Sequence, residues 1–144
     1  MANYVNIVAF SNDLKNVVVL TKLRGPEFLI GKDNIPGGHI EDGETPEFAA
    51  LRELKEETNL DAMKATKIAY KSWDGGELHT FVTRTDLSQL QSSTDEPVRI
   101  EDINQYMAHL VLNPEAAAPD IPDLITKGLK AIFPEVVPTS LELN

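Results

Sequence analysis

The feature that most constrains this chain is a glycine-rich loop that leads directly into a helix crowded with acids, residues 37–60. Residues 41–57 contain seven Asp or Glu residues against Arg52 and Lys55, a net charge of −5. The whole chain of 144 residues carries −10, so half of its excess charge lies in this short segment. Because like charges on one helix repel each other, the segment indicates a cation held among these acids.

The hydrophobic pattern after Pro46 has a period of 3.6 residues and predicts a helix that ends at about Thr58. Thr45 can cap its N-terminus, and proline suits the first helical position. Asn59 stands where a left-handed C-cap falls. The boundaries of this helix are therefore well marked in the sequence.

A helical wheel separates this helix into two faces. An apolar stripe, which we expect to face the core, consists of Phe48, Leu51, Leu54 and Thr58. The opposite face carries Glu53, Glu56 and Glu57 within an arc of roughly 100°. Ala49 and Ala50 lie one turn earlier on the acidic face, and their small side chains would leave room for a cation. A hard divalent ion such as Mg²⁺ prefers carboxylate oxygens and retains several waters.

The glycines before the helix allow backbone conformations that are closed to other residues. Gly37, Gly38 and Gly43 bracket a short loop that ends at Glu44. Such a loop can set carbonyl oxygens beside the acidic face. The loop and the acids together therefore predict a metal site rather than an ordinary charged helix.

These residues resemble the Nudix box, the signature of the Nudix hydrolase family. Eight of its nine defined positions match: Gly38, Glu44, Arg52, Glu53, Leu54, Glu56, Glu57 and Leu60. The departure is Asn59, which replaces a glycine. The change is mild, because asparagine is the next most common residue at a left-handed helix cap.

The resemblance implies an α/β fold, the Nudix α/β/α sandwich with a mixed β-sheet. It implies dependence on Mg²⁺ or Mn²⁺ and hydrolysis of the diphosphate linkage in a nucleoside diphosphate joined to another group. The same resemblance assigns metal binding to Glu53, Glu56 and Glu57. It gives Arg52 the task of orienting a neighbouring glutamate, and it lets the Gly37–Gly38 backbone add a ligand. A further acid outside the box is expected, with Glu96 as first choice and Glu101 and Asp102 as rivals.

Phosphoanhydride hydrolysis leaves a protein little covalent work, so positioning and neutralisation of phosphate charge should dominate the rate. Bound cations lower the pKa of a coordinated water, and a carboxylate within reach takes its proton. Glu53 is the first candidate for this base. Metal ions also reverse the local sign of charge, so an acidic protein can bind an anionic substrate.

The box leaves three functions open. The first candidate is a nucleoside triphosphate pyrophosphohydrolase, which releases a monophosphate and pyrophosphate. The second is a hydrolase of ADP-ribose, nucleotide sugars or dinucleotides. The third is a non-catalytic regulator that binds a nucleotide. The complete set of acids favours turnover over the third function.

Side chains outside the box supply weaker candidates for substrate binding. Three cations could reach phosphates and one histidine touches the site: Lys22, Arg24, Lys32 and His39. Four aromatic residues could stack on a base: Trp73, Phe28, Tyr70 and Phe81. Because aromatics in predicted strands usually belong to the core, we expect these four to be core residues.

The remaining chain predicts a β-rich domain with two further helical regions. The expected strands cover residues 4–10, 16–23, 65–73, 77–87 and a short segment near 98–100, with 65–87 as a hairpin. A helix can start at 101–107, and another covers 123–133. We expect a single domain over 1–144 with a loosely held tail at about 134–144.

The amino-acid composition and net charge limit the class of protein and the kinds of partner that it can bind. With 42% hydrophobic residues and no cysteine, the chain fits a globular protein without disulfides or thiolate metal sites. We expect a cytoplasmic protein without a signal peptide or membrane span. The charge of −10 argues against binding to duplex nucleic acid, so the expected partner is a small-molecule nucleotide, and a homodimer is left open.

Overall fold

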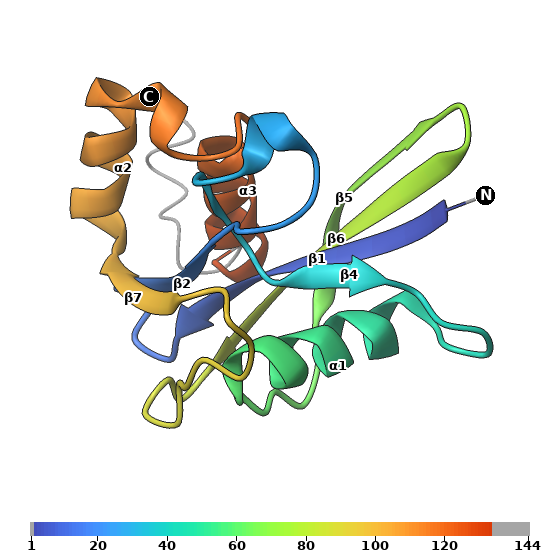
Figure 1. Cartoon of the computed structure of the whole chain (residues 1–144). Coiled ribbons are helices and arrows are strands. Elements are labelled where there is room, and N and C mark those ends of the chain that lie inside the picture. The colour runs from blue at the N-terminus through green and yellow to red at the C-terminus, as the bar shows by residue number, and fades with distance from the viewer. Residues whose placement is uncertain (1, 134–144) are drawn as a thin grey trace, which may run out of the picture.

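The chain folds around one mixed β-sheet in a computed structural model that describes residues 2–133 (Figure 1). The strands are β1 (Ala2–Ser11), β2 (Asn16–Thr21), β3 (Asp33–Asn34), β4 (Gly37–His39), β5 (Thr66–Trp73), β6 (Gly76–Thr85) and β7 (Val98–Asp102). Their order is β3-β2-β1-β6-β5, with β4 paired to β1 and β7 paired to β2. The β1–β6 pair is parallel and the other pairs are antiparallel, which makes the sheet mixed.

Helices cover both faces of the sheet and complete the predicted α/β/α sandwich. The helical segments are α1 (Pro46–Thr58), α2 (Ile103–Leu112), α3 (Ile121–Ile132) and the short 3₁₀ turns η1 (Glu27–Leu29) and η2 (Pro114–Ala116). Figure 1 shows α1 on one side of the sheet and α2 and α3 on the other. The predicted fold class is therefore confirmed.

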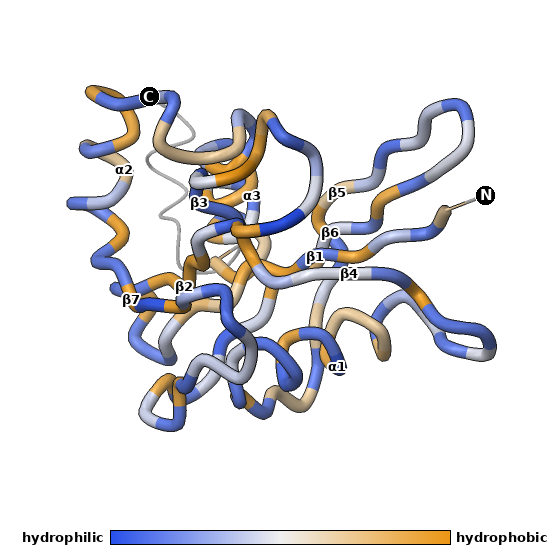
Figure 2. The backbone as a smooth tube through the Cα atoms, viewed as in Figure 1, coloured by the Kyte–Doolittle hydropathy of each residue, from blue (hydrophilic) through white to orange (hydrophobic). Residues whose placement is uncertain are grey.

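Alternation along β1 divides the core into two layers, because successive side chains of a strand point to opposite faces. Val5 and Ile7 join the buried cluster beneath α1. Val8 and Phe10 join the larger cluster beneath α2 and α3. Apolar residues accordingly dominate the inner strands, and polar residues dominate the outer loops (Figure 2).

The edge of β1 that faces away from β6 is shared by two strands. Phe10 pairs with Val17 of β2, whereas the segment from Tyr4 to Asn6 pairs with β4. This division brings the glycines of β4 against the start of β1, directly before the loop that enters α1. The sheet thus positions the glycine-rich loop beside the acidic helix.

The caps of α1 form as predicted. The Thr45 Oγ1 atom accepts a hydrogen bond from the Phe48 N–H at 3.2 Å, and Pro46 is the first helical residue. Asn59 ends the helix in the left-handed conformation with φ of 63°. Asparagine therefore takes the place of the box glycine without leaving its backbone conformation.

The predicted faces of α1 are partly right: Leu54 and Thr58 are fully buried as expected, but the predictions for Phe48 and for the two alanines are wrong. Ala49 and Ala50 are fully buried against the sheet, whereas Phe48 is 60% exposed. The small side chains let the helix axis approach the sheet closely, so the face that carries them turns inward. The alanines therefore leave no room for a cation, and Glu53 and Glu57, which share their face, become half-buried.

The later elements match their predictions with small shifts. The hairpin is formed by β5 and β6, and Asp102 caps α2 through the Gln105 N–H. Helix α3 starts two residues before the predicted Asp123. A Cβ atom at Gly128 would lie 3.0 Å from side-chain atoms of Phe10 and Val82, so this glycine allows close packing on the sheet.

Two further predictions concern the C-terminal tail and membrane-spanning helices. The loose tail at 134–144 lies outside the described residues. Within residues 2–133, no helix is long and apolar enough to cross a membrane.

Candidate active site

Arg52 lies at the centre of the acidic cluster. Its Nε and Nη2 atoms bind the two carboxylate oxygens of Glu44 at 2.5 and 2.9 Å. Its Nη1 atom contacts Glu53 Oε1 at 3.0 Å and Glu56 Oε2 at 3.1 Å. A further bond runs to the His39 carbonyl oxygen at 3.0 Å. One guanidinium therefore fixes the loop and two helix acids together, including the predicted contact to a neighbouring glutamate.

The Arg52–Glu44 pair is the structural anchor of this cluster. The Arg52 hydrogen bonds hold the pKa of Glu44 below its ordinary value, and the Glu44 bonds raise the pKa of Arg52. The Arg52 and Glu44 side chains are 17% and 10% exposed. Because both charges are largely shielded and the contact is bidentate, each partner depends on the other.

Glu53 and Glu57 occupy a different electrostatic environment. Burial, together with the neighbouring Glu53 charge, raises the pKa of Glu57 to about 8, although a hydrogen bond from the Gly37 backbone opposes the shift. Burial also raises the pKa of Glu53 despite the opposing Arg52 contact. Two carboxylates one helical turn apart are thus crowded into a half-buried space that favours a bound cation over two free charges.

Gly38 provides the space that the Glu53 carboxylate fills. A Cβ atom at this position would lie 2.5 Å from Glu53 Oε1 and 2.6 Å from Glu53 Cδ. Any side chain at residue 38 would therefore push this carboxylate away from β4. The sequence pairs glycine with glutamate in the box, and the structure supplies the steric reason.

The residues present fit a divalent metal ion in charge and in donor type. Glu53, Glu56 and Glu57 would hold it with hard carboxylate oxygens, and the Gly37–Gly38 backbone adjoins them. Within the described part of the chain, no three acidic or histidine side chains converge on one point. Arg52 binds two of the three acids, so the acids surround a positive charge of the chain itself.

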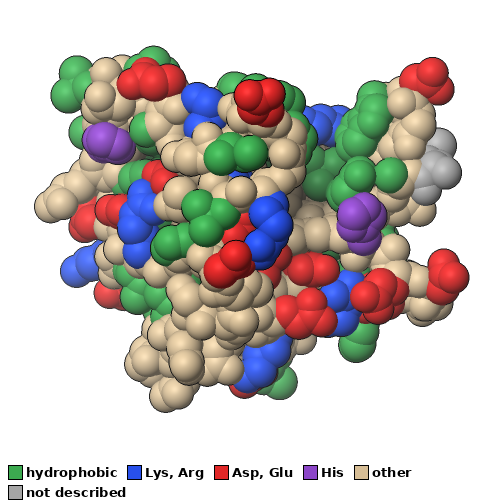
Figure 3. Space-filling view, in the orientation of Figure 1, with side chains coloured by type: hydrophobic (Ala, Val, Ile, Leu, Met, Phe, Trp, Pro, Cys, Tyr) green, Lys and Arg blue, Asp and Glu red, His purple; other side chains and the backbone are tan. Residues whose placement is uncertain are grey.

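A cleft of about 730 Å³ opens beside these acids. Glu57, Gly37 and Gly38 line it beside α1, and Tyr4 and Trp73 line it nearer the turn of the β5–β6 hairpin. In Figure 3 a hollow lies between the β5–β6 hairpin and the rest of the domain, with hydrophobic side chains on the hairpin wall. This volume is within the range of roughly 300–1,000 Å³ that is usual for small-molecule sites.

The four predicted substrate contacts divide into two groups. Lys22 and His39 line the cleft. Arg24 lies outside it and pairs with Asp95, and Lys32 donates to the Glu115 carbonyl oxygen at 2.5 Å. The structure therefore brings Lys22 and His39 together with the acids, and Arg24 and Lys32 serve loop contacts instead.

Glu96, the acid predicted outside the box, is already bound to protein groups. Its carboxylate accepts hydrogen bonds from the Leu23 N–H at 2.7 Å and the Arg24 N–H at 3.2 Å, and it contacts Lys22 Nζ at 3.4 Å. Metal binding by Glu96 stays a prediction. Of its rivals, Glu101 binds Arg99 and Asp102 caps α2.

The prediction that the four aromatics belong to the core is wrong for three of them. Phe81 is buried, whereas Phe28, Tyr70 and Trp73 are 70%, 52% and 46% exposed. Phe28 and Trp73 line the cleft. The signal that could have found Trp73 is its place beside the Asp74–Gly75 turn, where a strand leaves the cover of the helices.

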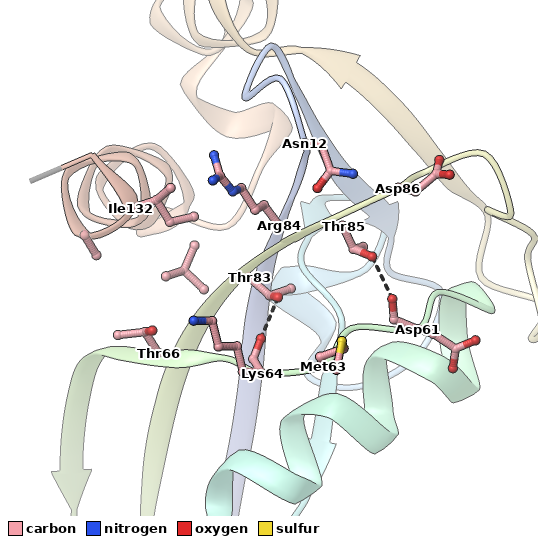
Figure 4. Close-up of a pocket in the computed structure, with 12 residues that line it drawn as sticks. Asn12, Asp61, Met63, Lys64, Thr66, Thr83, Arg84, Thr85, Asp86 and Ile132 are labelled. Atoms are coloured by element: carbon pink, nitrogen blue, oxygen red, sulfur yellow. Dashed lines mark hydrogen bonds between the residues drawn. The ribbon is translucent and has the colours of Figure 1, made fainter. Parts of the chain in front are cut away.

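A second hollow of about 600 Å³ lies between the end of α3 and β6 (Figure 4). Its walls include Lys64, Arg84 and Asp86, and two threonine hydroxyls close its floor by donating to the Lys64 and Asp61 carbonyl oxygens. It is separate from the Glu53–Glu57 cluster. The cleft beside Glu57 is therefore the candidate active site.

Comparison with known protein families identifies the family to which this chain belongs. The NUDIX domain family matches residues 2–127, which covers most of the chain. The chain belongs to the Nudix family. The resemblance predicted from the box is thus confirmed, and Nudix hydrolases generally use divalent metal ions.

Curated relatives of this Nudix chain match over short stretches. A segment of 34 residues is 62% identical to the ADP-ribose pyrophosphatase of Bacillus subtilis (strain 168) and spans 24% of this chain and 18% of that protein. A segment of 44 residues is 46% identical to the 8-oxo-dGTP diphosphatase of Proteus vulgaris and spans 31% of this chain and 39% of that protein. The matches therefore cover less than half of either relative.

Solved structures share the Nudix fold over nearly the whole chain. A MutT structure from work on Aliivibrio salmonicida and Vibrio cholerae has a TM-score of 0.69 and 22% identity, and it covers 88% of this chain and 98% of that one. The NUDIX domain of Shewanella oneidensis NrtR complexed with ADP ribose has a TM-score of 0.71 and 19% identity, with 90% and 87% covered. At these identities the likeness shows the fold alone.

Proposed function

We propose that this Nudix chain hydrolyses a phosphoanhydride bond of a nucleotide with Mg²⁺ or Mn²⁺ held by Glu53, Glu56 and Glu57. The observation that carries the proposal is the half-buried Glu53–Glu57 pair at the end of a ligand-sized cleft. Family membership supports a hydrolase of this class, as do the two relatives, a pyrophosphatase and a diphosphatase. The first candidate activity is nucleoside triphosphate pyrophosphohydrolysis.

The proposed reaction is attack of water at phosphorus. A new P–O bond forms to the water oxygen, the bond to the bridging oxygen breaks, and the water proton passes to a carboxylate, for which Glu53 is our assignment. The metal, when bound, neutralises phosphate charge and acidifies the water. Arg52 holds the Glu53 Oε1 atom at 3.0 Å and so keeps the base in place. Lys22, at the rim of the cleft, can contact a phosphate.

A second activity has its own support. The ADP-ribose pyrophosphatase match is 62% identical, although over only 34 residues, and the NrtR domain was solved with ADP ribose. Hydrolysis of ADP-ribose, a nucleotide sugar or a dinucleotide is therefore the alternative. The products separate the two activities, because only triphosphate cleavage of the first kind releases pyrophosphate.

The first test replaces metal-binding acids without changing their size. Glu56→Gln or Glu57→Gln should lower kcat by at least about 100-fold, because each removes a ligand from the reacting centre. Glu47→Gln, in the same helix but outside the cluster, should keep the parent rate. Near-parent turnover in both test variants would contradict the proposal.

The second test is a panel of nucleoside triphosphates, ADP-ribose, nucleotide sugars and dinucleotides, each with Mg²⁺ or Mn²⁺ and with product identification. Turnover of a triphosphate with release of pyrophosphate is the expected result. Tight nucleotide binding without hydrolysis of any member would favour a non-catalytic binding protein instead.

A further inference from the structure

The far end of the cleft presents an aromatic surface that the proposed chemistry at Glu53 does not use. Tyr4 and Trp73 have nearly parallel rings, 19° apart in plane with centroids at 6.2 Å. The His39 ring lies 4.6 Å from the Tyr4 ring. All three residues line the cleft that also holds Glu57.

The strand register explains why this surface is uncovered. Tyr4 pairs with Leu78 of β6, and Leu78 pairs with Lys71 of β5, so these side chains share one face of the sheet. Farther along β1, Val8 and Phe10 lie on this same face of the sheet, where they pack in one cluster with residues of α3. The β5–β6 hairpin extends beyond the helices (Figure 1), which leaves the aromatic end of the face open.

Trp73 is held in position by the strand beside it. A Cβ atom at its partner Gly76 would lie 2.7 and 2.8 Å from the Trp73 ring atoms Cζ2 and Cε2, so the indole rests directly on the glycine backbone. Gly76 is buried even though Trp73 is 46% exposed. An aromatic ring with one face packed and the other open is a preorganised stacking surface.

Phe28 supplies a second aromatic side chain from a different part of the chain. It belongs to η1, is 70% exposed and lines the same cleft. Large apolar side chains exposed together around a hollow indicate a binding site. A planar ligand is the chemistry that matches these rings, since every base has a π-face that stacks on aromatics.

We propose that Trp73, with Tyr4 beside it and Phe28 of η1 in the same cleft, binds the nucleobase of the substrate by stacking. The orientation of the ligand rests on the proposed function. In that orientation the phosphates lie near Lys22 and the metal-binding Glu57, and the base lies at the hairpin. Lys71 also lines this cleft, with its ammonium 3.8 Å from the Asp120 carboxylate. Substrate choice is thus set on the hairpin, away from the acids.

The sequence contains one tryptophan, so the tryptophan fluorescence comes from Trp73 alone and reports a ligand that binds against it. Titrating the metal-free protein with AMP or GMP should quench its fluorescence with saturation. Ribose 5-phosphate and pyrophosphate, which lack a base, should leave the signal unchanged. Binding of AMP or GMP detected by calorimetry without any fluorescence change would overturn the proposal, as would the absence of binding by both nucleotides.

Variants separate stacking from general structural damage. Trp73→Ala should weaken nucleotide binding about tenfold or more and raise KM in proportion while kcat stays within about threefold, whereas Trp73→Phe should keep most of the affinity. Tyr70→Ala is the matched control, because Tyr70 lies on the same strand with 52% exposure but is not among the residues that line the cleft. Equal losses in Trp73→Ala and Tyr70→Ala would contradict the assignment.

The outcomes distinguish this inference from the proposed function. Base-dependent quenching without hydrolysis of any substrate would support stacking and reject the hydrolase. Hydrolysis with an unchanged KM in Trp73→Ala and Phe28→Ala would support the hydrolase and reject stacking.

Discussion

Two adjacent glycines of β4 serve different purposes. A Cβ atom at Gly37 would collide with the Val5 carbonyl oxygen and would lie 2.9 Å from Asn6 Cα, both of which are backbone atoms of a central strand. At Gly38 the colliding atoms belong to the end of the flexible Glu53 side chain. The first glycine therefore allows strand pairing, and the second allows a carboxylate to take its position.

This difference predicts a loss of activity from one alanine substitution and a loss of stability from the other. Gly38→Ala should keep the melting temperature near that of the parent but lower kcat at least about tenfold, because the Glu53 carboxylate must move. Gly37→Ala should lower the free energy of unfolding by about 1–3 kcal/mol through overpacking against β1. Thermal unfolding and steady-state kinetics of both variants check this. Full activity in a stable Gly38→Ala protein would contradict the role given to Gly38.

The Glu77 carboxylate gives a pH-dependent contribution away from the acids of α1. It accepts hydrogen bonds from His79 Nε2 at 3.0 Å and from the Tyr70 hydroxyl at 2.7 Å, and these bonds hold the pKa of Glu77 below its ordinary value of 4.5. The unfolded chain binds this proton more readily, so the contribution to stability is present above pH 4.5 and is lost as pH falls through the lowered pKa.

Thermal unfolding of Glu77→Gln at several pH values measures this contribution. The variant should have a lower melting temperature than the parent at pH 7, and the two curves should approach each other as the pH falls below 4.5. A difference that stays constant with pH would mean that the carboxylate charge of Glu77 is unimportant.

At the scale of elements, α1 shows what local sequence does and does not determine. Capping depends on residues next to the helix ends, so Thr45, Pro46 and Asn59 could be recognised from sequence alone. Orientation depends on how closely the helix approaches β1, which a helical wheel does not contain. The helical wheel therefore predicts the wrong environment for Ala49 and Ala50, although it places them correctly relative to Glu53.

The C-cap of α1 can be tested directly. Asn59→Ala should lower the free energy of unfolding by about 1 kcal/mol, because alanine is disfavoured at φ of 63°. Asn59→Gly, which restores the family residue, should be tolerated better despite losing the bond from Nδ2 to the Gln89 carbonyl oxygen. Chemical denaturation of both variants measures the difference. A variant with alanine as stable as the one with glycine would show that the cap conformation is not the reason for asparagine.

At the scale of the whole molecule, the Nudix box identified the family and the acids but not the cleft that adjoins them. The box acids, glycines and Arg52 lie within one contiguous segment, so their proximity follows from local structure. The cleft joins β1, η1, β4 and the hairpin, which are distant in sequence. Trp73 and Glu96 could not be placed without strand pairing and loop contacts across about 70 residues, such as that between Leu23 and Glu96.

The like charges of the acidic cluster predict that metal ions stabilise the folded chain. Saturating Mg²⁺ should raise the melting temperature, with a gain of about 2.7 kcal/mol when its concentration is 100 times Kd. The double variant Glu53→Gln/Glu57→Gln should lose this response, whereas Glu47→Gln should keep it. A metal-independent melting temperature in the parent would argue against a cation at these acids.

Gly37 and Gly38 connect two sides of one sheet: α1 packs on the face of Val5, and the aromatic rings lie on the face of Tyr4. Chemistry and recognition are therefore carried by separate pieces of the chain that meet only at a strand edge. A descendant of this protein could acquire a new ligand by exchanging the hairpin and the η1 loop while inheriting its reaction centre intact.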